Sequence, residues 1–269
     1  MLLTYFLNYR KVLSMRCVIA LFLLLAGCTQ AQDPTRNPAV QGKELKEKPM
    51  VIAVIDTGFG YRNHGHGARL CKYGHKDFSQ DQNFDGGFVT KAPVPRDLHG
   101  HGTNIVGLIE RGLKGETNYC IVIIKFYSDS QTGRQNLRAS VKALTYAANI
   151  KAKIVNYSGG GPESDEYEGT AVRKLLLQGA KVVAAAGNEH ADIGLASNYY
   201  FPAQYDPRVV VVGNGTSERQ RAPSSNYGNR VNRWEYGTNQ EGFEIKMTGT
   251  SQATAIATGK IAAEMLHGK

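Results

Sequence analysis

A serine that could act as a nucleophile lies near the C-terminal end of the chain, inside a run of small residues. Ser251 follows Gly249 and Thr250, and the small residues continue to position 259. This composition predicts a tightly enclosed helix, because small side chains let neighbouring elements approach on every side. At the N-terminus of that helix, free N–H groups and the helix dipole would stabilise the oxyanion of an attacked carbonyl. The alternative is a buried packing helix in which Ser251 serves only as N-cap.

Three further polar residues stand where a nucleophilic serine would need partners. Asp56 directly follows the apolar run of residues 51–55, and His101 lies in a Gly-rich turn before an amphipathic stretch. Asn188 follows a second apolar run, residues 182–186. An imidazole beside a carboxylate can take a hydroxyl proton, and an amide can donate to an oxyanion. Taken singly, each residue also has a structural explanation, as a turn or N-cap aspartate, a solvated histidine and an ordinary Gly-Asn turn.

Short apolar runs alternate with amphipathic stretches through the body of the chain. The runs have the length and composition of strands buried on both faces: residues 51–55, 121–124, 153–155, 182–186 and 209–212. Apolar residues recur at helical spacing in residues 103–112, 136–149 and 168–179. This alternation predicts an α/β fold, a three-layer sandwich with a mainly parallel central sheet. Active sites in such folds gather at the carboxyl ends of the strands.

The four polar motifs, in the order Asp, His, Asn and Ser, resemble those of the subtilisin-like serine peptidases, the subtilase family. The resemblance covers residues 49–267, and we take residues 49–269 as the catalytic domain. It implies a subtilisin-like fold and serine endopeptidase activity on peptide or protein substrates. Ser251 would form the acyl-enzyme, while His101 takes and returns the proton and Asp56 holds the imidazole. The amide of Asn188 would donate to the oxyanion.

The resemblance also places the substrate. Residues 156–161 are similar to the family's substrate-binding strand, and the substrate backbone would pair as an added strand along Ser158, Gly159 and Gly160. The pocket at the cleaved bond would have walls from residues 158–161 and 184–203. Their content of Ala, Gly and Tyr favours apolar or aromatic substrate side chains.

Several positions depart from the family's usual pattern. Gln252 and Ala255 stand where relatives usually carry Met and Pro, which would place a polar side chain close to the nucleophile and loosen the first helical turn. Asn104 replaces a frequent second histidine, a change that we expect to matter little. Only 27 residues separate Cys28 from Asp56, too few for the folded prodomain of many secreted relatives.

Three functions fit these residues. The first is an endopeptidase anchored at the cell envelope. The second is a catalytically inactive subtilase-fold lipoprotein that acts as a binding or scaffolding module, although the presence of all four polar residues argues against it. The third is a processing enzyme with one dedicated substrate, which the unusual Gln252 and the short N-terminal region would suggest.

The N-terminal region has the layout of an export signal. Basic residues precede an apolar run at residues 18–25 that is too short to span a membrane, and Cys28 ends a tetrapeptide that resembles the bacterial lipobox. We therefore expect residues 1–27 to be a lipoprotein signal peptide, Cys28 to carry the lipid, and residues 28–48 to be a tether. Thr29 after the cysteine favours the outer membrane, facing the periplasm or the cell surface. An ordinary signal peptide with an incidental cysteine is the alternative.

The modest positive net charge could favour anionic surfaces, but the distribution of the basic residues does not indicate nucleic acid as a partner. The net charge is +9 for the whole chain and falls to +6 without residues 1–27, and no Lys/Arg cluster is interleaved with aromatic residues. We expect a monomer with a solvated basic surface.

The remaining cysteines and one acidic loop raise two further questions. Once Cys17 and Cys28 are accounted for, Cys71 and Cys120 remain, either as one disulfide or as two buried free thiols. Asp81, Asn83 and Asp85 have the opening spacing of a calcium loop, but Ala92 stands where the closing Glu would be. We therefore expect no required cofactor, and the alternative is calcium as a structural ion in this loop.

Overall fold

A parallel sheet of seven strands forms the centre of the part of the chain that the structure describes. The structure is a computed structural model, and it describes residues 48–79, 93–216 and 220–268. In the order β2-β3-β1-β4-β5-β6-β7, every neighbouring pair is parallel. The strands are β1 (Met50–Asp56), β2 (Lys76–Asp77), β3 (Tyr119–Lys125), β4 (Ile154–Tyr157), β5 (Lys181–Ala185), β6 (Val210–Gly215) and β7 (Arg233–Tyr236). A separate antiparallel hairpin joins β8 (Gln240–Gly242) to β9 (Ile245–Met247).

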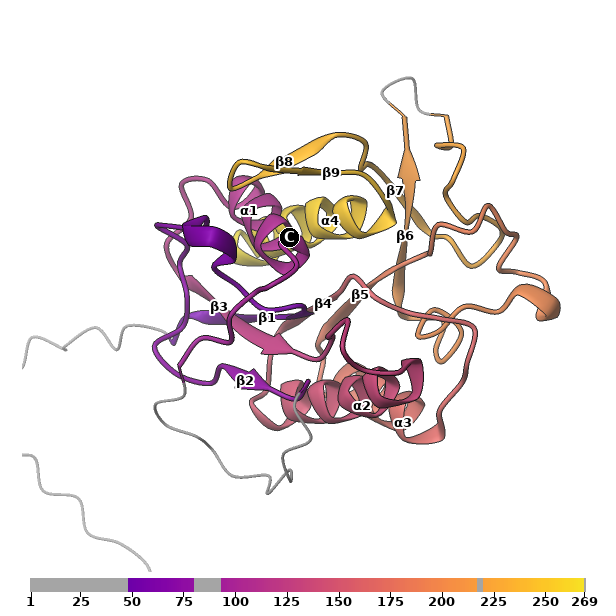
Figure 1. Ribbon diagram of the computed structural model, residues 1–269, viewed down its shortest axis with the longest axis horizontal. Helices are drawn as coiled ribbons and strands as arrows, with labels where there is room; N and C mark the ends of the chain where they lie inside the picture. The colour runs from indigo at the N-terminus through magenta and orange to yellow at the C-terminus, as the bar shows by residue number, and fades with distance from the viewer. Residues whose placement is uncertain (1–47, 80–92, 217–219, 269) are drawn as a thin grey trace, which may run out of the picture. The chain divides into compact units, whose positions relative to one another are not determined.

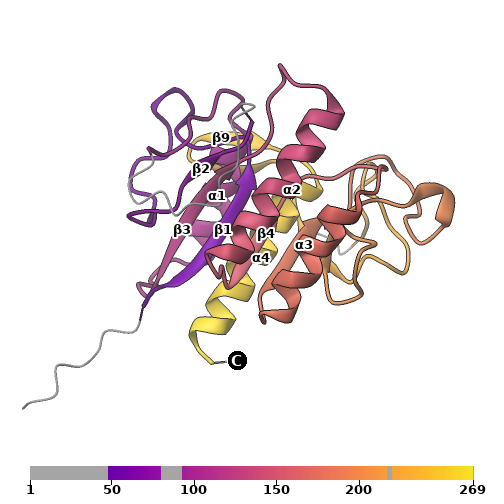
Figure 2. The same ribbon diagram turned by 90° about the horizontal axis from the view of Figure 1, so that it is seen from below.

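Two pairs of helices cover the two faces of this sheet (Figure 1, Figure 2). On one face lie α1 (His101–Gly112) and α4 (Thr250–Leu266), and on the other lie α2 (Gly133–Asn149) and α3 (Glu166–Leu177). Alternate residues of β1 point into the two cores. Ile52 and Val54 belong to the core under α1 and α4, whereas Ala53 and Ile55 belong to the core under α2 and α3. The predicted α/β sandwich is therefore confirmed.

The predicted elements correspond to β1, β3, β4, β5 and β6 and to α1, α2 and α3, with ends shifted by a few residues. The sequence did not predict β2 or β7. β2 has only two residues, and β7 alternates half-buried and exposed residues because it lies at the edge of the sheet. Neither strand therefore shows the continuous apolar run of a strand buried on both faces.

The α-helices of the described residues begin in two different ways. Thr132 and Gln135 form a reciprocal capping box at α2, and the carboxylate of Asp165 accepts from two N–H groups at α3. In contrast, α1 and α4 begin after Gly100 and Gly249, which carry no capping side chain. The first turns of α1 and α4 are thus open to partners from elsewhere in the fold.

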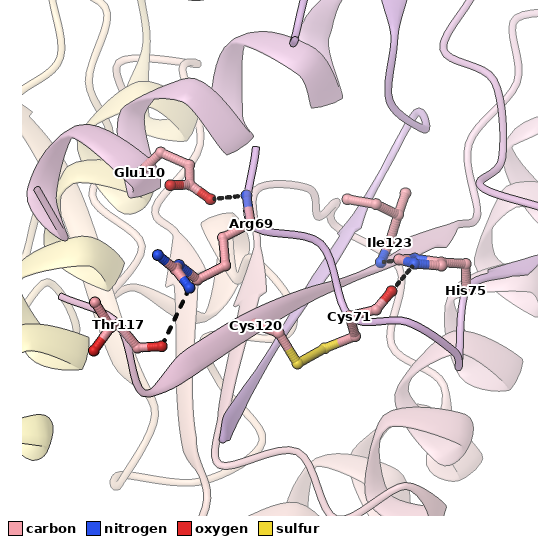
Figure 3. Close-up of a disulfide and its surroundings, with 7 residues drawn as sticks. All are labelled: Arg69, Cys71, His75, Glu110, Thr117, Cys120 and Ile123. Atoms are coloured by element: carbon pink, nitrogen blue, oxygen red, sulfur yellow. Dashed lines mark hydrogen bonds between the residues drawn. A yellow bond between two sulfur atoms is a disulfide. The ribbon is translucent and has the colours of Figure 1, made fainter. Parts of the chain in front are cut away.

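A disulfide joins Cys71 to Cys120 on β3, with the two Cα atoms 4.8 Å apart (Figure 3). Of the two states left open for these cysteines, the structure has the disulfide. Beside it, His75 is buried, accepts at Nδ1 from the Ile123 N–H and donates from Nε2 to the Cys71 carbonyl. These two bonds require the neutral ring, because a protonated His75 could not accept. Burial accordingly lowers the pKa of His75, against the raising effect of the Cys71 carbonyl.

Several predictions fall on residues outside those that the structure describes. They concern the signal segment 1–27, the lipid site Cys28, nearly all of the tether 28–48, and the calcium candidate Asp81, Asn83 and Asp85. Within the described ranges, no helix has the length and apolarity needed to span a membrane.

Candidate active site

Asp56 and His101 form a hydrogen-bonded pair at the carboxyl end of β1. Asp56 is the last residue of β1, is almost completely buried, and accepts from His101 Nδ1 over 2.7 Å. His101 is the first residue of α1. The helix can approach β1 this closely because its second residue is Gly102, where a Cβ atom would overlap the carbonyl oxygen of Gly58.

The hydrogen bond between Asp56 and His101 determines which ring nitrogen of the neutral imidazole carries the proton. A carboxylate can only accept, so Nδ1 carries the proton and Nε2 is left as the basic nitrogen. Burial acts to lower the pKa of His101, but the charge and hydrogen bond of Asp56, aided by the charge of Asp97, outweigh it and raise the pKa. His101 is thereby held in the tautomer and orientation that a general base requires.

A second buried carboxylate, Asp97, organises the turn that carries His101. It accepts five hydrogen bonds, from the hydroxyls of Thr57 and Thr103 and from the N–H groups of His99, Gly100 and Thr103. Burial acts to raise the pKa of Asp97, but these donors outweigh it and lower the pKa. The sequence analysis missed Asp97. Its position four residues before His101, ahead of a Gly-rich turn, was the available signal.

Ser251 lies in the first turn of α4, as the sequence predicted, and contacts the segment directly after β4. Its hydroxyl donates to the Ser158 carbonyl over 2.9 Å, and the Ser158 hydroxyl donates to the Ser251 carbonyl over 3.1 Å. In this structure the hydroxyl is therefore directed at Ser158. His101 and Ser251 line the same cavity.

Asn188 lies beyond the end of β5 and is tied to the start of α4. Its Oδ1 accepts from the Thr250 N–H over 3.0 Å. Because that donor is a backbone group, the bond fixes which end of the amide faces α4 and leaves the NH₂ group as a donor. Asn188 and Ser251 line one cavity.

That cavity has a volume of about 500 Å³ and brings the predicted site residues together. It is lined by Asp56, His101, Ser158, Gly159, Gly160, Asn188 and Ser251, together with aromatic and glycine residues.

Glu168 of α3 also lines the cavity. It is a buried carboxyl group that accepts from the hydroxyls of Ser140, Tyr157 and Tyr205. Burial raises the pKa of Glu168, while these hydroxyls act in the opposite direction. The sequence analysis missed Glu168. Its acidic neighbours in the sequence are typical of the solvent-exposed start of a helix, so nothing marked Glu168 as buried.

Gln252 and Asn104, the two departures from the expected pattern, contact each other. The Gln252 side chain is buried, and its Nε2 donates to Asn104 Oδ1 over 3.1 Å. Asn104 Nδ2 in turn donates to the carbonyls of Gln240 and Ile245 in the β8–β9 hairpin. The Nε2 end of the amide thus points into the interface between α1 and α4, whereas its Oε1 lies close to Gly249 at the start of α4, so a polar group of Gln252 remains near the turn that carries the nucleophile.

The described residues contain no group of three or more His, Cys, Asp or Glu side chains that could hold a metal ion. The acidic loop considered for calcium lies outside those residues.

The geometry agrees with comparisons to known proteins. The chain matches the Subtilase family over residues 47–266. It is 28% identical over 237 residues to the major intracellular serine protease of Bacillus subtilis (strain 168), covering 84% of this chain and 72% of that protein. It is 27% identical over 245 residues to thermitase of Thermoactinomyces vulgaris, and the match covers 87% of this chain and 79% of thermitase. Among solved structures, a cold adapted subtilisin-like serine proteinase superposes with a TM-score of 0.64 at 28% identity. The superposition covers 81% of this chain and 76% of that proteinase.

Proposed function

The chain belongs to the subtilase family and is a serine endopeptidase, and we propose that it cleaves peptide bonds through Asp56, His101 and Ser251. The observation that carries this assignment is the 2.7 Å bond between Asp56 and His101, in a cavity that Ser251 and Asn188 also line. A buried carboxylate, an oriented imidazole and a hydroxyl at a helix start are the parts that acyl transfer needs.

The reaction begins at Ser251. Its hydroxyl turns from Ser158 toward Nε2 of His101, which takes the proton as the oxygen attacks the substrate carbonyl. Asp56 stabilises the imidazolium that forms. His101 then donates the same proton to the departing amine, and the peptide bond breaks to leave the acyl chain on Ser251. Water, activated by the same nitrogen of His101, hydrolyses the ester and restores the hydroxyl.

The oxyanion is bound from two sides. The NH₂ group of Asn188 donates from the loop after β5, and the backbone N–H of Ser251 donates from the first turn of α4. The bond from Thr250 to Asn188 holds the amide in this direction before substrate arrives. An extended peptide pairs along Ser158, Gly159 and Gly160, which line the same cavity.

A covalent label at Ser251 tests this mechanism. The purified chain is exposed to a fluorophosphonate, and its intact mass is measured beside that of the Ser251→Ala, His101→Ala and Ser130→Ala variants. We expect one adduct on Ser251, lost in Ser251→Ala and His101→Ala and retained in Ser130→Ala, because Ser130 is exposed and lies outside the cavity. No adduct on folded wild-type protein would contradict the proposal.

We also propose that the enzyme acts at the bacterial cell envelope as a monomer anchored by lipid at Cys28, in the outer membrane. The support is the basic and apolar N-terminal pattern followed by a cysteine in a lipobox-like context. Fractionation after labelled-palmitate feeding tests it: the wild type should carry label in the membrane fraction, and Cys28→Ser should carry none. An unlabelled wild-type chain would refute the anchor without affecting the catalytic proposal.

A further inference from the structure

Tyr200 is held against the substrate-binding strand by the backbone that carries it. The next residue, Phe201, exchanges both backbone hydrogen bonds with Gly161, over 2.8 Å and 3.1 Å. This antiparallel bridge fixes the segment after β5 beside residues 158–161. The position of Tyr200 at the cavity is therefore set by main-chain pairing as well as by side-chain packing.

The ring of Tyr200 lies between Gly160, which lines the cavity, and Gly187, the residue before the lining residue Asn188. A Cβ atom on Gly160 would lie 2.5 Å from Cε1 of the ring, and one on Gly187 would lie 2.8 Å from Cε2. These carbons are on opposite edges of the ring, so its phenol end spans the gap between the two backbones. A larger residue at either position would overlap the ring, and it would also overlap the Phe201 carbonyl at Gly160 or the Asn226 and Glu189 side chains at Gly187.

In the proposed mechanism the substrate pairs along Ser158 to Gly160, with its reactive carbonyl at Ser251 and the amide of Asn188. The family resemblance implies that the side chain before the cleaved bond enters a pocket with walls from residues 158–161 and 184–203. Gly160 and Gly187 belong to these two segments, and the Tyr200 ring, which lines the cavity, stands between them.

We propose that Tyr200 fills the primary specificity pocket, so that the enzyme cleaves after residues with small side chains, such as Gly, Ala and Ser. This inference rests on the proposed function of Ser251 and specifies its substrate class. It replaces the preference for apolar or aromatic residues that composition suggested. An added aromatic ring would have to displace the Tyr200 ring or strain both glycine walls.

The Tyr200 ring has polar neighbours on its Gly187 side. Burial raises the pKa of its hydroxyl, and the charge of nearby Glu189 adds to this effect. The amide of Asn226 donates to Glu189 Oε2 over 2.6 Å, so the carboxylate beside the ring is hydrogen-bonded. The phenol is therefore neutral and lies beside Gly187 on one side and Gly160 on the other.

A substrate series tests the proposal. Four peptide anilides, identical except for Gly, Ala, Leu or Phe before the anilide, are compared by kcat/KM on protein first titrated with a fluorophosphonate. In the wild type we expect kcat/KM for the Gly or Ala substrate to exceed kcat/KM for the Leu and Phe substrates by at least about tenfold. This is the discrimination typical of a few methylene groups in a pocket. The Tyr200→Ala variant should raise kcat/KM for the Phe substrate at least about tenfold and should change kcat/KM for the Ala substrate little.

Two control variants separate the ring from general effects. Tyr200→Phe keeps the ring and should retain the wild-type preference. Tyr199→Ala removes the neighbouring ring, which is 42% exposed and lies outside the cavity, and should also retain it. If the Tyr200→Ala variant does not fold, the preference of the wild type among the four anilides is by itself the test of the proposal.

The outcomes distinguish this inference from the proposed function. Labelled wild type that prefers Leu or Phe, or a folded Tyr200→Ala variant that still rejects Phe, would overturn the inference and leave the catalytic proposal standing. Wild type that neither labels at Ser251 nor cleaves any peptide would overturn both. If labelled protein cleaves no anilide, the residues before each cut in a digested peptide library supply the same comparison.

Discussion

Replacing Gln252 by methionine should destabilise the enzyme through one buried hydrogen bond. Gln252 is 1% exposed and donates to Asn104, which is completely buried. Methionine has a similar length but no donor, so Asn104 Oδ1 loses its partner at the interface between α1 and α4. A buried acceptor left without a partner costs about 1–3 kcal/mol, and we expect the free energy of unfolding to fall by this amount.

The effect of Asn104→Ala should be larger. That change removes the acceptor of the Gln252 amide and also the donor to the carbonyls of Gln240 and Ile245. Since the two side chains contact each other, their effects should not add. A double-mutant cycle should give a coupling energy between Gln252 and Asn104 of about 0.5–3 kcal/mol.

Urea unfolding of the wild type, the two single variants and the double variant measures these energies. Gln178→Met serves as control, because Gln178 is exposed after α3 and its replacement should change stability by less than about 0.5 kcal/mol. We also expect kcat to fall more than KM rises, because the bond joins the first turns that carry His101 and Ser251. A loss below about 0.5 kcal/mol for Gln252→Met together with no coupling would refute the assigned hydrogen bond.

Three other changes have defined outcomes. Asp56→Asn should lower kcat about 10⁴-fold and move the acid limb of the pH–rate profile to lower pH, because His101 loses both its tautomer and the carboxylate that raises its pKa; an unchanged profile would count against the pair. Replacing Cys71 and Cys120 by serine should lower the free energy of unfolding by about 4 kcal/mol, from the 49-residue separation that the disulfide closes, measured by urea unfolding under oxidising conditions. The lowered pKa of His75 means that its stabilising contribution is present above the ordinary histidine pKa of about 6.5 and is lost as pH falls through the folded value. His75→Gln can keep both hydrogen bonds without titrating, so wild-type stability should decrease relative to this variant on acidification, by at most about 1.4 kcal/mol per pH unit; parallel curves would contradict the buried neutral ring.

Local patterns in the sequence determined the layers and the places of the site residues. Strands buried on both faces require continuous apolar runs, and surface helices require apolar residues at helical spacing, so the order of β1, α1, β3 and α2 follows from short windows of residues. Asp56 and Ser251 were found in the same way, because the end of a strand and the start of a helix are local features. The cysteine count left two states open, and the fold decided between them by placing Cys71 beside β3.

The tertiary structure decided the contacts between residues far apart in the chain. Gln252 and Asn104 are 148 positions apart, and only the packing of α4 against α1 brings the Gln252 amide within hydrogen-bond distance of Asn104. Tyr200 belongs to a segment with no periodic pattern, and its ring enters the cavity because Phe201 pairs with Gly161. Sequence periodicity fixes which face of an element is buried, but the direction of a polar side chain depends on which distant donor or acceptor the fold brings within reach.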